Sequence, residues 1–175
     1  TNINETPNNN TDDDNNGLVD DYYGYNFING NNDLMDVNGH GTHVAGTIAA
    51  VMDNNQGIVG VCPRCRVMAV KAFYDTGWGD SSSVAQAIYY AVRQGAKIIN
   101  ASSGGRGPIP QVISEAINFA HTNNVVVVTA AGRGSGDAAE QAIAGHYRTI
   151  TVGAIDQYEV QTSTSNYGLK VDVVA

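Results

Sequence analysis

The chain has 175 residues, of which 42% are hydrophobic and 20 are glycine, and its formal net charge is −8. This length suits one domain with a real core, and the composition is that of a compact α/β protein, not a disordered one. Nine lysines and arginines cannot supply the basic stripe that a phosphate backbone needs, which excludes nucleic acid as a partner.

No apolar run reaches the roughly 18 residues that a membrane helix requires, so we expect no contact with a membrane. The first residues do not form a signal peptide. We expect any targeting segment to have been removed or to lie outside this chain.

Residues 1–35 have almost no aliphatic periodicity, and eleven of the first 32 residues are asparagine, which predicts a loop. Residues 12–21 place oxygen-bearing side chains at alternate positions around Gly17, a spacing typical of calcium loops. The twelfth position is Tyr23 instead of the bidentate Glu of an EF-hand, and a solvated acidic loop is the alternative. The candidate calcium ligands are Asp12, Asp14, Asn16, the Leu18 carbonyl, and Asp20 or Asp21.

Two histidines, three glycines and two threonines lie in residues 38–47, just before an apolar stretch. Gly39 and Gly41 allow the backbone to approach the His40 ring closely. The pattern predicts a helix that begins at this histidine. The positive end of a helix dipole favours neutral histidine, the form that a general base needs. Asp36 is close in sequence, but we expect it to lie on the entry loop.

Cys62 and Cys65 are the two cysteines of the chain. Their spacing suits a redox pair, half a zinc site or a small disulfide. A four-ligand zinc site needs two further ligands, which no other cysteine provides. A local disulfide or two inert thiols are therefore favoured.

Apolar strand patterns and amphipathic helical patterns alternate after residue 38. Strands that are apolar on both faces and separated by helices favour a parallel sheet covered on both sides. No Gly-x-Gly-x-x-Gly opens a helix after a strand, which argues against a Rossmann nucleotide-binding fold. We expect helices at residues 40–52, 82–93 and 110–123, and strands at residues 67–73, 97–102, 125–131 and 149–155.

The seven residues from His40 to Gly46 resemble the histidine motif of the subtilisin-like serine proteases, His-Gly-Thr-His-Val-Ala-Gly. The resemblance implies that His40 is the general base and that His43 is not a triad member. It also implies a three-layer α/β fold with a mostly parallel sheet flanked by helices. Peptide-bond hydrolysis through an acyl-enzyme, a structural calcium ion, a peptide or protein substrate, and secretion from the cell are further expectations.

Later segments resemble other parts of the same family. Residues 54–61 resemble its second calcium-holding loop, which implies Asn54 or Asn55 as a ligand. The strand at residues 125–131 resembles the one that leads to the oxyanion hole, but Arg133 stands where the family has asparagine. The segments that resemble the substrate-binding edge strands contribute Gly77, Trp78, Gly79, Ser102, Ser103 and Gly104.

In the family the triad acid follows an apolar strand as Asp-Thr-Gly or Asp-Ser-Gly, and no such strand precedes His40; the Gly-Thr-Ser-x-Ala motif of the family does not occur in the chain. The resemblance therefore indicates a loop at residues 1–35 and a partial catalytic domain at residues 36–175, incomplete at both ends. The remaining segment of that domain is an expected partner. Two other functions stay open, namely a non-catalytic module that binds peptides or a partner, and a calcium-dependent structural domain.

Overall fold

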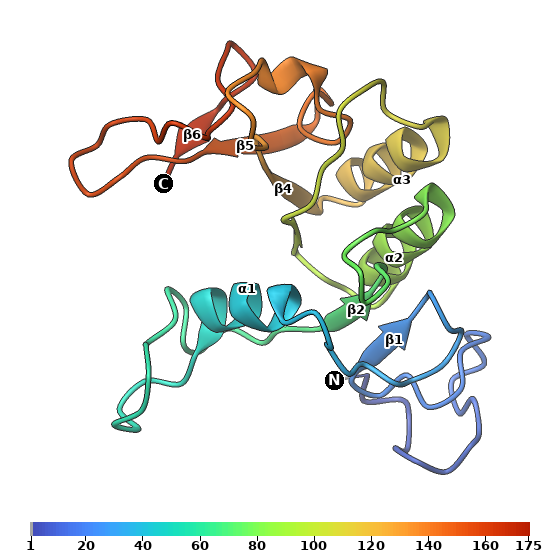
Figure 1. The fold of residues 1–175 in the computed structure, drawn as a ribbon. Coiled ribbons are helices and arrows are strands. Elements are labelled where there is room, and N and C mark those ends of the chain that lie inside the picture. Colours follow the sequence, from blue (N-terminus) through green and yellow to red (C-terminus); the bar gives the residue numbers. More distant parts are fainter. Residues whose placement is uncertain (1) are drawn as a thin grey trace. The chain divides into compact units, whose positions relative to one another are not determined.

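The computed structural model describes residues 2–175, and the chain divides into two compact units, the first ending at Ala87 and the second beginning at Ile88. The boundary falls within helix α2 (Ser81–Arg93). Figure 1 follows the chain through both units. No helix of the described residues is long and apolar enough to cross a membrane.

The first unit contains helix α1 (His40–Ala49) and a parallel pair of strands, β1 (Gly24–Asn26) and β2 (Ala69–Lys71). No residue of α1 is fully buried, although the small apolar face expected from Val44 and Ala45 is half-buried. Long irregular segments make up most of the rest of this unit (Figure 1).

Strand β1 lies inside the segment predicted to be loop, so that prediction is wrong for three residues. A Cβ at Gly24 would collide with the carbonyl oxygen of Ala69, so only glycine allows this pairing. Asn26 is fully buried, and its side-chain oxygen accepts the N–H groups of Ile28 and Asn29. The strand shows no apolar pattern in the sequence, because the hydrogen bonds of a buried amide side chain hold it in place.

The second unit is built on a four-stranded parallel sheet in the order β3-β4-β5-β6. Its β-α-β order confirms the parallel α/β architecture expected from the alternating patterns. Helix α3 packs against β4, and the Tyr89 ring of α2 lies 5.0 Å from the Phe119 ring of α3. The elements are β3 (Ile98–Ala101), α3 (Gln111–Thr122), β4 (Val126–Ala130), η1 (Ala138–Glu140), β5 (Thr149–Gly153) and β6 (Val173–Val174).

The two faces of this sheet differ in exposure. Val127, Thr129 and Thr151 are buried on one face, next to the buried side of α3. On the other face Ile98 is 66% exposed and Ile150 is 39% exposed. Within this unit α3 covers the first of these faces, and the parallel sheet with flanking helices agrees with the fold class predicted from the sequence.

Candidate functional site

His40 is the first residue of α1, and it is exposed. The preceding Gly39 has φ 83°, a left-handed conformation that glycine adopts at little cost. The chain therefore turns at Gly39 and enters the helix at His40. Asn38 holds the turn through a 3.0 Å hydrogen bond from its side-chain nitrogen to the carbonyl oxygen of Asp75.

Asp36 caps the first turn of this helix. Its carboxylate accepts the Gly39 N–H at 3.0 Å, the Thr42 N–H at 2.7 Å and the Thr42 hydroxyl at 2.8 Å. The hydrogen bond from the Thr42 amide is the main reason why the pKa of Asp36 lies below its usual value. The role of this residue is thus to fix the segment that carries His40.

The first of the two predicted substrate-binding segments is an exposed turn in the first unit. Trp78 is 79% exposed, and its carbonyl oxygen accepts the Tyr74 N–H at 2.7 Å. A Cβ at Gly79 would lie 2.6 Å from the carbonyl oxygen of Ala72, so the chain is tightly packed there. Gly77 to Gly79 form no strand in the structure.

The second predicted segment, Ser102 to Gly104, follows the C-terminal end of β3 in the second unit. Ser102 and Ser103 are half-buried and Gly104 is exposed. The Asn100 side chain donates a 2.8 Å hydrogen bond to the Ser102 hydroxyl. The Ser102 side chain is therefore held at the strand end, and the next residues, Gly104 to Arg106, are exposed.

Arg133 lies in the turn that follows β4 and is exposed. Its guanidinium forms no hydrogen bond or ion pair with any other residue in the range 2–175. Its backbone forms an isolated bridge with Ser165. The side chain at the predicted oxyanion position is thus not held by its own contacts.

Asn166 braces this turn, and no sequence pattern indicated its role. Its side-chain nitrogen donates to the carbonyl oxygen of Ala131 at 3.0 Å, and its side-chain oxygen accepts the Gly136 N–H at 3.1 Å. Its own N–H donates to the carbonyl oxygen of Gly132 at 3.0 Å. A buried amide 33 residues after Arg133 therefore fixes the backbone around that residue.

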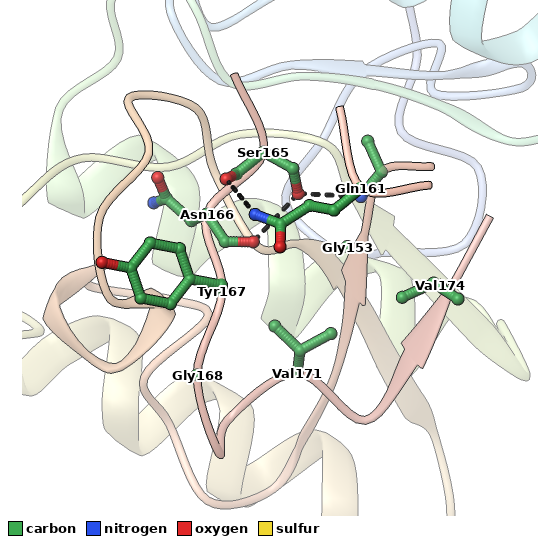
Figure 2. Close-up of a pocket in the computed structure, with 9 residues that line it drawn as sticks. Gly153, Gln161, Ser165, Asn166, Tyr167, Gly168, Val171 and Val174 are labelled. Carbon is green, nitrogen blue, oxygen red and sulfur yellow. Dashed lines mark hydrogen bonds between the residues drawn. The ribbon is translucent and has the colours of Figure 1, made fainter. Parts of the chain in front are cut away.

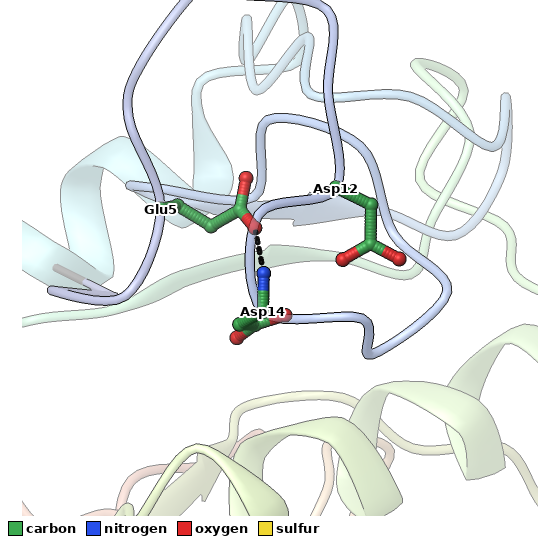
Figure 3. Close-up of side chains that lie close together, drawn as sticks. All are labelled: Glu5, Asp12 and Asp14. Carbon is green, nitrogen blue, oxygen red and sulfur yellow. Dashed lines mark hydrogen bonds between the residues drawn. The ribbon is translucent and has the colours of Figure 1, made fainter.

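The acidic loop brings Asp12 and Asp14 together with Glu5, which the sequence did not indicate (Figure 3). One carboxylate oxygen from each of the three residues lies within 4.8 Å of the other two. This group of three carboxylates, the Glu5 cluster, is the only set of metal-ligating side chains of this kind in the described residues.

The other predicted calcium ligands make contacts elsewhere. Asp20 accepts the N–H groups of Asn9 and Asn10 at 2.9 and 3.0 Å. Asp21 accepts hydrogen bonds from the side chains of Asn2 and Asn16. Among the remaining candidates, the Asn16 oxygen accepts the N–H of Leu18, and the Asn54 oxygen accepts the N–H of Gln56.

A serine and a histidine lie together in the second unit, but they do not form a nucleophile and a base. The Nδ1 atom of buried His146 accepts the Arg148 N–H at 3.2 Å. Its Nε2 therefore carries the proton and donates to the Ser114 hydroxyl at 3.1 Å. Burial, together with the positive charges of Arg148 and Lys170, lowers the pKa of His146. The imidazole is held neutral, with the wrong nitrogen protonated to activate the serine.

A pocket of about 210 Å³ lies in the second unit (Figure 2). Val171 and Val174 contribute apolar surface to it. The Ser165 hydroxyl accepts the Ala154 N–H at 2.9 Å and donates to the carbonyl oxygen of Asn166 at 2.9 Å. The hydroxyl is therefore committed to internal hydrogen bonds and is not available for catalysis.

The two cysteines form a disulfide with a Cα–Cα distance of 5.3 Å, which confirms one of the two favoured alternatives. The disulfide follows a segment that is tied to the end of α1. The N–H groups of Gly60 and Cys62 donate to the carbonyl oxygens of Ala50 and Ile48. The bridge therefore closes a loop directly behind the helix that carries His40.

The described elements and motifs match those of known proteases. The model of the subtilase family matches residues 2–175, and the chain belongs to this family. The thermophilic serine proteinase of Bacillus sp. (strain AK1) is 44% identical over 152 residues, covering 87% of this chain and 37% of that protein. Thermitase of Thermoactinomyces vulgaris is 39% identical over 152 residues, covering 87% of this chain and 54% of that protein.

Two solved structures are also similar. A protease from Pseudoalteromonas arctica PAMC 21717 has a TM-score of 0.74 and 34% identity, over 78% of this chain and 43% of that one. A cold-adapted subtilisin-like serine proteinase has a TM-score of 0.71 and 30% identity, over 86% of this chain and 53% of that one. The chain thus spans about 37% to 54% of the length of the curated relatives named above.

Proposed function

We propose that the whole protein is a secreted subtilisin-like serine endopeptidase that hydrolyses peptide bonds through an acyl-enzyme. His40 is the general base, which takes a proton from the serine nucleophile and passes it to the leaving amine. The observation that carries the proposal is the place of His40, exposed at the start of α1 within the family's histidine motif. The substrate is a peptide or protein.

In this proposal residues 77–79 of the first unit and residues 102–104 of the second unit are each substrate-binding segments. Extended peptides bind by hydrogen bonding to exposed backbone, and small side chains leave the backbone accessible. Trp78 and Gly104 are exposed, which supports such a role. The remaining parts of the catalytic domain supply the triad Asp and Ser.

The test is fluorophosphonate labelling of the full-length protein, read by intact mass. We expect one serine to be labelled, and we expect His40→Ala to abolish labelling because the serine then lacks its base. His43→Ala is the matched control, since this second histidine of the motif is not assigned to the triad. Labelling that survives His40→Ala would contradict the assignment.

A non-catalytic peptide-binding module is the second candidate, and Arg133 favours it. The family has an asparagine at this position that donates to the oxyanion, and arginine is larger, charged and differently shaped. Full-length protein that binds a peptide substrate but shows neither labelling nor hydrolysis would support this candidate. A calcium-dependent structural domain is the third, supported by unfolding on chelation without any hydrolase activity.

Calcium is the proposed structural ion of the acidic loop. Six carboxylates lie within residues 5–21, and hard oxygen donors of this kind suit Ca²⁺. Their number and the absence of lysine and arginine from the same segment support the proposal. Calcium-dependent thermal stability of the full-length protein is the direct test.

A further inference from the structure

Glu5 has an unusual environment for a carboxylate. Its side chain is only 4% exposed although it lies in an irregular segment. One oxygen, Oε1, accepts the N–H groups of Asp13 and Asp14 at 2.8 and 3.2 Å. The other oxygen, Oε2, is buried and has no hydrogen-bond partner among the described residues. Burial of an unpartnered charged oxygen is costly, so a partner is missing.

The nearest charged groups increase this cost. The carboxylates of Asp12 and Asp14 complete the Glu5 cluster, with one oxygen from each residue inside 4.8 Å of the others (Figure 3). Arg64 is the first lysine or arginine of the chain, and none of the ion pairs formed within residues 2–175 includes a member of the cluster. Three negative charges at this spacing repel one another unless a cation lies between them.

The backbone holds the carboxylates in place before any ion binds. Asp12 accepts the N–H groups of Asn16 and Gly17 at 3.1 and 2.8 Å. Asp14 accepts the Asn16 N–H at 3.1 Å and the Asn2 side chain at 3.0 Å. A carboxylate oxygen has two lone pairs, so each still has capacity for a metal. The fixed donors make the cluster a prepared site.

We propose that Glu5, Asp12 and Asp14 form a calcium site, with Glu5 Oε2 as the buried ligand. Ca²⁺ binds oxygens at about 2.3–2.6 Å, so two ligands on opposite sides lie about 5 Å apart, and Mg²⁺ requires closer, nearly octahedral ligands. The three carboxylates come from an irregular segment and not from a rigid octahedral frame, which suits the ion with the more flexible coordination. The inference rests on the calcium binding proposed above but replaces the sequential ligand set of residues 12–21.

The site has a structural consequence. Glu5 and Asn2 belong to the first residues of the described chain, whereas Asp12 and Asp14 lie across an irregular loop. A bound ion joins these two segments directly. The cation therefore adds a cross-link to a loop that hydrogen bonds already hold, in a segment where the described residues form no helix or strand before β1.

The experiment is calcium titration of the full-length protein by calorimetry, using CaCl2 after removal of metal with EDTA. Glu5→Gln keeps an oxygen for the Asp13 and Asp14 N–H groups but places NH2 at the position of Oε2. We expect this variant to weaken calcium binding about tenfold or more, because one charged ligand is lost. Asp13→Asn is the matched control, since Asp13 lies in the same loop and binds Thr6 and Asn9 instead of the cluster.

Thermal unfolding gives a second readout. In EDTA we expect Glu5→Gln to unfold at a higher temperature than the wild type, because it removes one of three repelling charges. In millimolar calcium we expect the reverse order, because the wild type alone gains the full binding energy. A variant that is less stable under both conditions would show a merely structural Glu5 and would overturn the inference.

The outcomes separate this inference from the wider proposal. If Glu5→Gln binds calcium as tightly as the wild type and Asp20→Asn loses binding, the ligands are the sequential set and only the inference fails. If the wild type binds no calcium at millimolar concentration, both the site and the proposed calcium requirement fail. Equal affinity for Mg²⁺ would overturn the assignment to calcium. Hydrolase activity does not enter any of these results.

Discussion

Asp36 accepts two hydrogen bonds from a single residue, Thr42, one from its amide at 2.7 Å and one from its hydroxyl at 2.8 Å. The helix begins at His40, between these two residues. The carboxylate thus caps α1 from outside the helix and satisfies N–H groups that the first turn leaves unpaired. Gly39, at the cap position itself, has no side chain to do this.

Asp36→Ala is expected to lower the free energy of unfolding by about 1 kcal/mol, the usual cost of losing a helix cap. The pKa of Asp36 is lowered in the folded protein. The contribution of its carboxylate to stability is therefore complete above the ordinary pKa of 3.8, and it is lost as the pH falls through the lower pKa of the folded state. Urea denaturation at pH 7 measures the effect. Asp33→Ala, an exposed carboxylate outside the cap, is the control and should change little.

We expect the protein to lose stability in mild acid because of His146. Its pKa is lowered when folded, first by burial and then by Arg148 and Lys170, so the unfolded chain binds the proton more readily. Stability is therefore complete above the ordinary value of 6.5 and declines as the pH falls below it toward the lower folded value. Urea unfolding from pH 8 to pH 5 measures this slope.

The matched variants for this slope are His146→Gln and His121→Gln, because His121 is exposed on α3. We expect the first to flatten the decline between pH 7 and pH 5 and the second to leave it unchanged. An undiminished slope in His146→Gln would show that other groups cause the acid sensitivity.

The disulfide closes a loop of four residues, Cys62 to Cys65. Loop closure of this length contributes about 2 kcal/mol through the unfolded state. We expect Cys62→Ser with Cys65→Ser to lower the free energy of unfolding by that amount or less. A reductant should lower the free energy of unfolding of the wild type to that of the double variant. It should leave the free energy of unfolding of the double variant unchanged. No response of the wild type to reductant would contradict the expected contribution.

We expect the turn around Arg133 to tolerate substitution of Gly132 poorly. Its φ is 94°, and a Cβ there would lie 2.7 Å from the Asn166 side-chain nitrogen. Gly132→Ala is expected to cost about 1–3 kcal/mol, because it adds backbone strain and displaces the bracing amide. Gly136→Ala is the control in the same turn, since its Cβ would meet nothing closer than 4.0 Å. Equal losses of stability in the two variants would show that the hydrogen bonds of Asn166 do not stabilise this turn.

The helices were predictable from sequence because each carries a long apolar period. Ser81–Arg93 and Gln111–Thr122 lie within a residue or two of the ranges predicted for them. Helix α1 ends at Ala49, earlier than predicted, since the chain turns back there and Gly60 pairs with Ala50. Strand β1 could not be predicted, because three residues carry no period and their pairing with β2 is long-range.

The candidate sites also divide into features with a local sequence pattern, which were predictable, and features that depend on long-range contacts, which were not. The local pattern at residues 38–47 was sufficient to place His40 at a helix start. Glu5 and Asn166 were missed because each acts on a turn that is distant in sequence, and a single Glu or Asn has no local signature. Asp20 and Asp21 fit a calcium spacing by position, but in the structure they accept amide hydrogens from other parts of the loop.

Arg133 gives the sharpest test of the proposed catalysis. If this residue stands at the oxyanion position, Arg133→Asn in the full-length protein should raise kcat, because a neutral amide can donate to the developing charge. Loss of such a donor in subtilisin costs about 10²–10³ in kcat, which sets the largest gain to expect. KM should change little, since the contact forms in the transition state. The readout is hydrolysis of a peptide substrate.

Arg106→Asn is the matched control, because Arg106 is also exposed but pairs with Glu140 at 2.7 Å. It removes the same charge from the same unit, so a general effect of charge would change kcat in both variants. A rise in Arg133→Asn alone would place the side chain at the reacting centre. An unchanged or lower kcat in Arg133→Asn would mean that arginine already donates there, or that the turn braced by Asn166 does not reach the oxyanion.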